Sequence, residues 1–454
     1  MNKLKRIYMR TSWYPVFNFR NDAGKARSAL LATIIPQAIV GGFTGGTFYT
    51  GLLIGHGINI VNISILTLIP YIASLFTIFT PYILERFTKR RGILSIARIA
   101  YYLINIVGIT LLPQLVHEEG ARVTGLIIIT FAAHSVNFLF TSGYSPWHMP
   151  YITADVRNTY FTAQTLVSNI TSSLVMLIAS SIMDSIPEDA RLGFITVLRY
   201  AAFAVAFLDV YLLQVPKEPK YLASADRPKL VDIFRRPLQD KQFRITLLVL
   251  GSYALFANLP TSAMSAWLLN EVEVSYLYIT VVDATFFLFV LFTSRIWNKF
   301  LWKRGACKAM IAVMISEILA VGAYAFVNHS NYLWLMTLVR LTQHFFSMAW
   351  SFGVNHIYYE TLPPKDQTAH TSFYSLSQNI LAFISMSIGT WFISFMGDRS
   401  VKILGQPLTS VPLLMLIKVC LLVVFIGIVF LFRKKLEAPR SDAQAVESTA
   451  ADTQ

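Results

Sequence analysis

The sequence predicts an all-α membrane protein with twelve transmembrane helices in two six-helix bundles. Three observations support this fold class: long apolar segments recur along the chain, basic residues gather in every second loop, and a long polar loop separates six segments from six. Hydrophobic residues make up 55% of the 454 residues and charged residues only 14%, which is too apolar a balance for a soluble globular protein. Most of the excess apolar surface must therefore face lipid.

Each segment is long enough to cross a bilayer as a helix, because a hydrocarbon core of about 30 Å needs about 20 residues. The spans of the first half are expected at 29–55, 60–84, 92–113, 123–145, 161–183 and 193–215. Those of the second half are expected at 244–268, 276–297, 306–327, 331–356, 371–396 and 409–432. The two bundles are therefore 29–215 and 244–432, joined by a central cytoplasmic loop, 216–243.

The charges predict the orientation of these spans. Lys and Arg dominate the N-terminal arm, 1–28, and the central loop, and they begin the C-terminal tail, 433–454, at Arg433, Lys434 and Lys435. The opposite loops instead gather acids, at Glu118, Glu119, Glu188, Asp189, Glu271 and Glu273. By the positive-inside rule both ends of the chain are cytoplasmic, and we expect a multi-pass protein of the cell membrane. The tail is polar without apolar periodicity and is expected to be disordered.

The composition also argues against several functions. The net charge of +14 lies beside the spans and not in a separate basic domain, so nucleic acid is not an expected partner. Cys307 and Cys420 are too few for a disulfide framework or a thiolate metal site. The chain has no GxxxxGK[ST] motif for direct ATP drive and no HExxH motif for a zinc peptidase. We expect no metal and no other cofactor.

An internal similarity links the two halves. Residues 81–92 align without gaps on 294–305, and both segments directly follow the second span of their half. Identical residues pair Phe87 with Phe300, Arg91 with Arg304 and Gly92 with Gly305. Chance similarity between two basic loops is the alternative, but the order of the spans and the loop position both favour a repeat.

The segment 81–91 resembles the loop 2-3 signature of the major facilitator superfamily, in which an acid and an arginine lie between glycines and precede a basic run. Glu85 takes the place of the acid and Arg86 that of the arginine, whereas Pro81 and Thr88 replace glycines. With twelve spans and two related halves, the resemblance covers nearly the whole chain. It implies a secondary transporter whose two bundles rock around a central site, and we expect it to act as a monomer.

The resemblance also implies ion pairs that hold the cytoplasmic side closed. The superfamily uses the acid and the arginine of loop 2-3 for this purpose, and loop 4-5 offers further charges. The expected gating residues are Glu85, Arg86, Arg90, Asp155, Arg157 and Lys299. Exposed ion pairs are individually weak, but weak pairs can bias two conformations that are nearly balanced.

Ionisable residues inside the spans indicate function, because a charge at a helix centre costs about 2.5 to 3.5 kcal/mol in lipid. Asp283 and Arg340 lie roughly 10 to 14 Å from the outer ends of their spans, and His344 follows Arg340 by one helical turn. An acid, an arginine and a histidine that exchange partners can couple proton uptake to substrate movement. Asp283, Arg340 and His344 are thus the expected proton-coupling residues, although a static ion pair between two helices would give the same pattern.

The other intramembrane charges are expected to be structural. Arg199 and Asp209 lie ten residues apart on the sixth span, where they would reach the two interfaces or pair with neighbours. Glu317 and Lys418 fall on spans that the resemblance makes peripheral, which favours structural pairing or a contact between protomers.

The resemblance places the first and fourth spans of each half around the central cavity. The expected substrate-binding residues on these spans are Gln37, Thr44, His134, Asn137, Tyr144, Asn258, Arg340, Gln343, His344 and Trp350. Two interrupted stretches, 41–46 and 258–260, fall in corresponding spans, which points to a binding site in transporters built from repeats. Close helix packing is an equally good explanation of the glycines.

The sequence favours secondary transport of a small polar organic solute, sugar-like or an anionic or neutral metabolite, with proton coupling left open. Aromatic residues mixed with amides suit sugars and drug-like molecules alike, so multidrug efflux is the alternative within transport. A polytopic membrane enzyme is the alternative from another class, although His148, Asp155, His356 and Asp366 form no recognisable catalytic motif. The cargo and the direction of transport are not set by the sequence.

Overall fold

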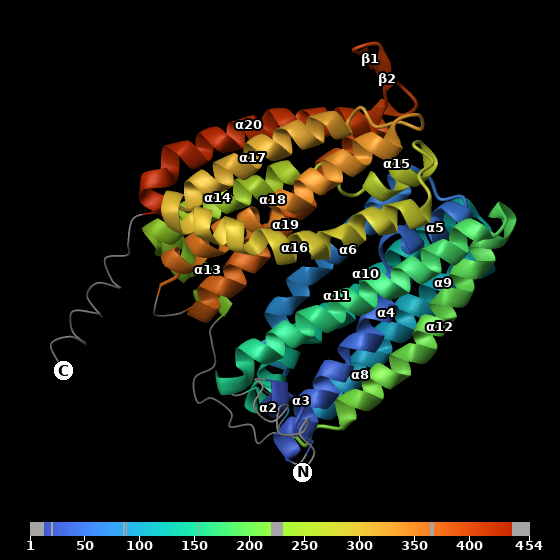
Figure 1. Cartoon of the computed structure of the whole chain (residues 1–454). Helices are drawn as coiled ribbons and strands as arrows, with labels where there is room; N and C mark the ends of the chain where they lie inside the picture. Colours follow the sequence, from blue (N-terminus) through green and yellow to red (C-terminus); the bar gives the residue numbers. More distant parts are fainter. Residues whose placement is uncertain are drawn as a thin grey trace, which may run out of the picture. The chain divides into compact units, whose positions relative to one another are not determined.

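The computed structural model describes residues 13–19, 21–84, 87, 89–152, 154–218, 230–363 and 367–437. The chain divides into two compact helical units (Figure 1). The first unit comprises Met1–Asn59 with Ala73–Ala225, and the second comprises Ile60–Ile72 with Asp226–Gln454. The N-terminal part of the second predicted span, α6 (Ile60–Ala73), is thus grouped with the second unit.

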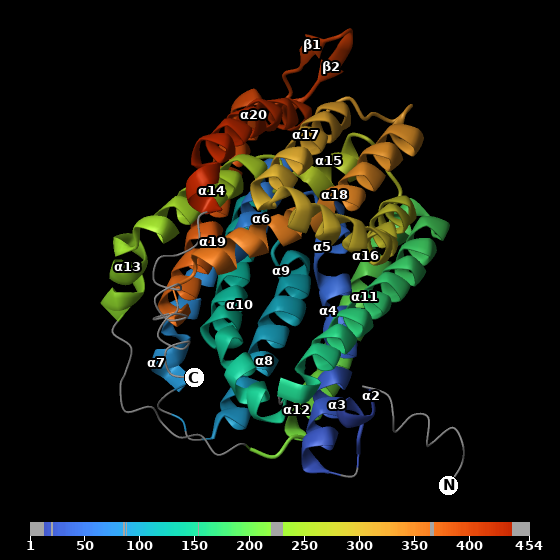
Figure 2. The same cartoon turned by 60° about the vertical axis from the view of Figure 1, so that its left-hand side comes forward.

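The other elements follow the chain in order (Figures 1 and 2). Those of the first unit are α2 (Trp13–Val16), α3 (Asp22–Ala32), α4 (Ile34–Thr44), α5 (Gly46–Gly55), η1 (Ser74–Phe79), α7 (Thr80–Leu84), α8 (Arg90–Tyr102), η2 (Leu103–Gly108), α9 (Ile109–Leu115), α10 (Glu119–His148), η3 (Met149–Tyr151), α11 (Ala154–Ser185) and α12 (Glu188–Gln214). Those of the second unit are α13 (Leu230–Gln239), α14 (Lys241–Ala257), α15 (Met264–Asn270), α16 (Tyr276–Arg304), α17 (Ala306–Tyr324), α18 (Tyr332–Thr361), α19 (Gln367–Met396), the antiparallel strands β1 (Val401–Ile403) and β2 (Gln406–Leu408), and α20 (Ser410–Leu436).

The prediction of a helical membrane protein is confirmed. Among the described residues, nine helical stretches are long and apolar enough to cross a membrane, and the bent pair Tyr276–Val290 and Phe292–Leu301 would make a tenth. The two predicted spans outside this set are helical as well. Residues 244–268 form α14 and α15, and a break at 258–263 keeps each of these helices short. Residues 331–356 lie in α18, and its polar side chains lower the mean hydropathy of that helix.

The first and third predicted spans of the first unit are each interrupted by an irregularity. The helix α4 ends at Thr44, Gly45 is extended, and Gly46 starts α5 with a φ of +53°, a left-handed conformation that glycine adopts without a steric penalty. In the third predicted span, the π-helical turn η2 separates α8 from α9. Both irregularities leave backbone carbonyls that need donors from outside the helix.

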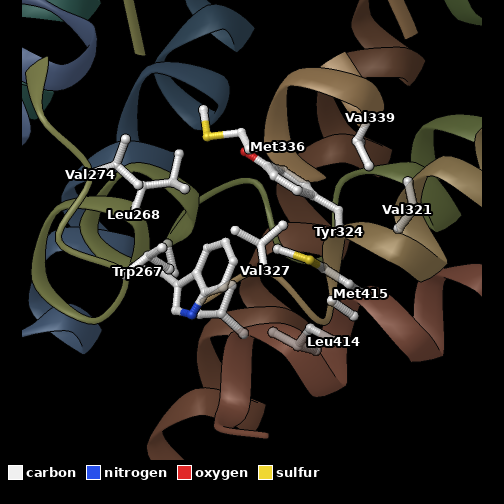
Figure 3. Close-up of a cluster of buried hydrophobic side chains, with 14 of the residues drawn as sticks. Trp267, Leu268, Val274, Val321, Tyr324, Val327, Met336, Val339, Leu414 and Met415 are labelled. Atoms are coloured by element: carbon white, nitrogen blue, oxygen red, sulfur yellow. The ribbon is translucent and has the colours of Figure 1, made fainter. Parts of the chain in front are cut away.

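A large apolar core holds the short helix α15 in the second unit. Figure 3 shows Trp267 of α15, Tyr324 of α17, Met336 of α18 and Met415 of α20 converging in one cluster, and each is at most 2% exposed. The rings of Trp267 and Tyr324 meet edge to face with their centroids 6.0 Å apart. Burial of a side chain as large as methionine contributes about 1.5 to 3 kcal/mol. The cluster therefore fixes α15 against three long helices.

One carboxylate in each unit caps a helix that begins the third span of its half. In the first unit, Glu218 accepts hydrogen bonds from the backbone N–H groups of Arg90 and Arg91 at 2.9 and 3.0 Å. In the second unit, Glu437 accepts a hydrogen bond from the backbone N–H of Cys307 at 3.0 Å. A carboxylate at a helix N-terminus satisfies unpaired donors and interacts favourably with the helix dipole. The similarity between the two halves therefore extends to the way their third helices begin.

Gly389 of α19 should be intolerant of any side chain, because a Cβ there would lie 2.0 Å from the carbonyl oxygen of Leu259. We expect Gly389→Ala to destabilise the protein by at least about 1 to 3 kcal/mol, as overpacking does in protein cores. The matched control is Gly427→Ala in α20, where an added Cβ meets nothing within 4 Å and helix propensity improves. Thermal unfolding in detergent measures both variants, and equal melting temperatures would contradict the prediction.

Candidate functional site

A fully buried carboxylate, Asp209 of α12, organises the polar interior of the first unit. It accepts hydrogen bonds from the Arg98 guanidinium at 3.1 and 3.3 Å, the Tyr102 hydroxyl at 2.6 Å and the Gln37 amide at 3.0 Å. The side chain of Asp209 is 0% exposed and that of Arg98 is 14% exposed. Asp209 thus pairs with a neighbour and does not reach an interface. Such a pair is costly to break, because loss of one partner leaves the other charge buried and uncompensated.

Sequence reasoning missed Arg98, which lies on α8 near the start of the predicted span 92–113. Its guanidinium also stacks over the ring of Tyr144, 4.1 Å from the centroid. The Tyr144 hydroxyl donates to the carbonyl of Leu94 at 2.9 Å, which orients the ring. The sequence did contain a signal for Arg98: a lone arginine within an apolar segment is costly in lipid and therefore requires a partner.

Arg199 of α12 stabilises the two interrupted helices of the first unit. Its Nε donates to the Thr110 hydroxyl at 2.7 Å, its Nη2 to the Asn105 carbonyl at 2.7 Å and its Nη1 to the Thr44 carbonyl at 3.4 Å. Thr44 ends α4, and Asn105 lies in the π-helical turn, so the guanidinium supplies donors at both irregularities. Arg199 is 0% exposed, so of the two expected alternatives, reaching an interface or pairing with neighbours, the structure shows the second.

In the second unit, Asp283 of α16 and Arg340 of α18 form the pair that the sequence suggested. Arg340 Nε lies 3.8 Å from Asp283 Oδ1, within ion-pair range but beyond a hydrogen bond. The Arg340 side chain is 25% exposed and that of Asp283 is 50% exposed. Arg340 also lies over the Tyr324 ring, 5.5 Å from its centroid. This pair is looser and more accessible than the pair of Arg98 and Asp209.

His344 lies beside this pair but bonds to the backbone. Its Nε2 is 3.2 Å from the carbonyl oxygen of Val282, the residue before Asp283. The rings of Phe286 and Phe289 pack against the imidazole, with centroids 5.4 and 6.3 Å away. The histidine is thus adjacent to the charged pair and hydrogen-bonded to neither of its side chains.

A second ionic cluster joins α17, α18 and α20. Lys418 Nζ lies 3.2 Å from Glu317 Oε1, and the Gln343 amide donates to both oxygens of Glu317 at 3.2 and 3.3 Å. The side chains of Lys418 and Glu317 are 13% and 17% exposed. The structural pairing expected of these two residues is therefore present. Gln343, predicted to bind substrate, is held by the same carboxylate.

Three other predicted substrate-binding residues lie within helices or at their ends. The Thr44 hydroxyl donates to the Val40 carbonyl at 2.7 Å, and the Asn258 amide donates to the Ala254 carbonyl at 2.7 Å. Asn137 is half-buried on α10. Thr44 and Asn258 thus bond to their own helices, each at the interruption that the sequence indicated.

The remaining predicted substrate-binding residues belong to aromatic clusters. Trp350 lies against the ring of Tyr253 with centroids 4.0 Å apart, and both rings contact Phe425. His134 packs against Tyr101, with ring centroids 5.8 Å apart. Among the interactions of the described residues, His134 makes no direct contact with the pair of Arg98 and Asp209 in the first unit. Trp350 likewise makes none with the ion pairs of the second unit.

The predicted gating residues are described only in part. Glu85 and Arg86 lie outside the described residues, and Asp155 and Arg157 fall in α11 without described side chains. Arg90 is 6% exposed at the start of α8, and Lys299 is exposed on α16.

Comparison with known proteins gives the fold and a family profile that matches part of the chain. The nucleoside transporter NupG is 13% identical with a TM-score of 0.63, covering 91% of this chain and 99% of that one. The xylose transporter XylE from E. coli, inward open, is 14% identical with a TM-score of 0.62, covering 91% and 96%. A bacterial homologue of the iron transporter ferroportin, inward-facing, is 11% identical with a TM-score of 0.67, covering 90% and 98%. The sequence profile of the Major Facilitator Superfamily matches residues 245–451.

The chain has the major facilitator fold. The fold similarity extends the match from the C-terminal half to nearly the whole chain. A search of curated protein sequences finds no match. The family profile and these transporter structures together indicate a transporter and not an enzyme.

Proposed function

We propose that the protein carries a small polar organic solute across the cell membrane by alternating access, with proton movement coupled through Asp283 and Arg340. The solute is sugar-like or an anionic or neutral metabolite. The moving bodies are the bundles 29–215 and 244–432, and the charged residues of loops 2-3, 4-5 and 8-9 bias the cytoplasmic gate. The chain acts as a monomer with both ends in the cytoplasm, an orientation that the loop charges support.

The observation that carries the proposal is the contrast between the two intramembrane pairs of an acid and an arginine. Asp209 is fully buried and accepts hydrogen bonds from Arg98, Tyr102 and Gln37. Asp283 is half exposed and has the guanidinium of Arg340 at 3.8 Å. A carboxylate at that depth is too costly against acyl chains, so its exposed half requires water or solute. An acid with a loose partner can exchange it for a proton, which favours coupling at Asp283.

Aromatic and amide groups on the predicted cavity helices support the proposed class of solute. The tilted ring pair of Trp350 and Tyr253 provides apolar faces, and Gln37 and Gln343 carry amide groups held by acids. Sugars and nucleosides are recognised by this combination of stacking and hydrogen bonding. Two solved structures of the same fold are named as nucleoside and xylose transporters, which supports a solute of this kind.

Binding followed by counterflow tests the proposed function. Purified protein is screened by thermal unfolding against mono- and disaccharides, nucleosides, carboxylates and cationic dyes, because a ligand that binds the native state raises the melting temperature. Each stabilising solute is then tested for counterflow in sealed proteoliposomes. We expect a sugar, nucleoside or metabolite to exchange unchanged. Stabilisation and export of the dyes alone would favour multidrug efflux, and absence of counterflow by every stabilising solute would contradict the proposal.

A further inference from the structure

The helix α13 carries an exposed apolar stripe directly before a transmembrane helix. Val231, Phe234 and Leu238 are 67%, 41% and 50% exposed, and their spacing of three and four residues places them on one helix face. Arg235 is exposed beside this stripe. We infer that α13 lies in the headgroup region of the bilayer, with the stripe among the acyl chains and Arg235 bound to the phosphate of an anionic phospholipid.

Contacts within the second unit hold α13 in this place. The ring of Phe234 meets Phe373 of α19 edge to face, with centroids 5.9 Å apart, and Pro237 is buried. Figures 1 and 2 both show α13 joined to the start of α14. Asp240 separates these two helices and caps α14 by accepting a hydrogen bond from the Phe243 N–H at 2.9 Å. The stripe therefore stays next to the membrane surface that α14 enters.

The charge of this segment selects the kind of lipid. Four basic residues stand against two acids between Val231 and Arg244, namely Arg235, Arg236, Lys241 and Arg244 against Asp232 and Asp240. The segment therefore carries a formal charge of +2. Basic residues beside an apolar helix face are the composition of helices that lie in the membrane interface, and each one near an anionic surface adds attraction. The alternative occupant of the stripe is a soluble partner protein. Such a partner would not require the stripe to lie directly before a membrane-spanning helix, whereas a lipid surface does.

The lipid preference is tested by thermal unfolding of the full chain in detergent with phosphatidylglycerol or phosphatidylcholine added. We expect phosphatidylglycerol to raise the melting temperature of the wild type more than phosphatidylcholine does. Arg235→Gln should remove at least half of this difference, whereas Arg235→Lys should keep it. The matched control is Arg236→Gln, which removes the same charge about 160° around the helix from Leu238 and should keep most of the difference.

The depth of the stripe is tested with a fluorescent label in lipid vesicles that contain nitroxide-labelled acyl chains. Cys307 and Cys420 are first replaced by serine, and a bimane label is attached at Leu238→Cys or at Arg236→Cys. Quenching of the label at 238 should exceed that at 236 by at least about twofold, because only the stripe faces the acyl chains.

Three outcomes would overturn the inference. The first is an equal response of Arg235→Gln and the wild type to phosphatidylglycerol. The second is equal quenching at the two labelled positions. The third is efficient crosslinking between two chains through Leu238→Cys, which would show that a second copy covers the stripe. These readouts need no transported solute, so they fail or succeed independently of the proposed function.

Discussion

Replacing Asp283 with asparagine should abolish proton flux driven by the transported solute while leaving counterflow of that solute measurable. The asparagine keeps the size of the side chain but cannot carry a proton, and Arg340 loses the charge that lies 3.8 Å from it. We expect coupled proton uptake to fall at least about 100-fold, the scale of losing a positioned proton carrier. The measurement is the change in internal pH of proteoliposomes after addition of solute.

The matched control for this result is Glu273→Gln, which also neutralises an acid near the start of α16. Glu273 is 68% exposed and pairs with His329 outside the membrane-spanning helices, so coupled flux should be unchanged. Undiminished proton flux in Asp283→Asn would show that the pair with Arg340 is a static connection between two helices. An equal loss in both variants would indicate a nonspecific electrostatic effect.

Replacing Arg98 with methionine should severely destabilise the first unit. The substitution leaves the carboxylate of Asp209, which is 0% exposed, without its cation. Removing one partner of a buried ion pair typically costs about 3 to 5 kcal/mol, because the other charge stays buried and uncompensated. Unfolding of the purified protein in mixed micelles measures this loss, and the yield of folded protein should fall with it.

A second substitution separates the charge from the packing. In the double variant Arg98→Met with Asp209→Asn, the buried charge is gone and the amide still bonds to Tyr102 and Gln37, so more than half of the lost stability should return. Lys217→Met breaks an exposed ion pair with Asp22 and should have no measurable effect. Two results would contradict the role of Arg98 as the partner of the buried Asp209. One is a single variant as stable as the wild type, and the other is a double variant that recovers no stability.

The helical architecture and the positions of its interruptions could be predicted from the sequence because both are local properties. Apolar length predicted the membrane-spanning helices, and the glycines of 41–46 predicted the break at Gly45. The same reasoning placed Asp283 and Arg340 at similar depths and so allowed their pairing. The π-helical turn η2 has no such local signature, and the donor to its Asn105 carbonyl, Arg199, comes from another helix.

The pairing of Arg98 with Asp209 could not be predicted, because the two residues are 111 positions apart and only packing brings them together. Arg98 lies close to the basic cluster that starts its span, where an arginine fits the charge pattern of a loop. The distinction between a locked pair and an accessible one also depends on burial, which the sequence does not encode locally. Asp209 and Asp283 look alike in the sequence and differ in the structure by exposure and by number of donors.

The carboxylate caps have a consequence for how the two halves are made. Glu218 follows α12 and completes α8, and Glu437 follows α20 and completes α17, so each half ends with the residue that its own third helix needs. Splitting the gene within codons 221–229 should therefore give two polypeptides that each keep the cap of their own third helix. A fragment truncated just before either glutamate should accumulate poorly in the membrane.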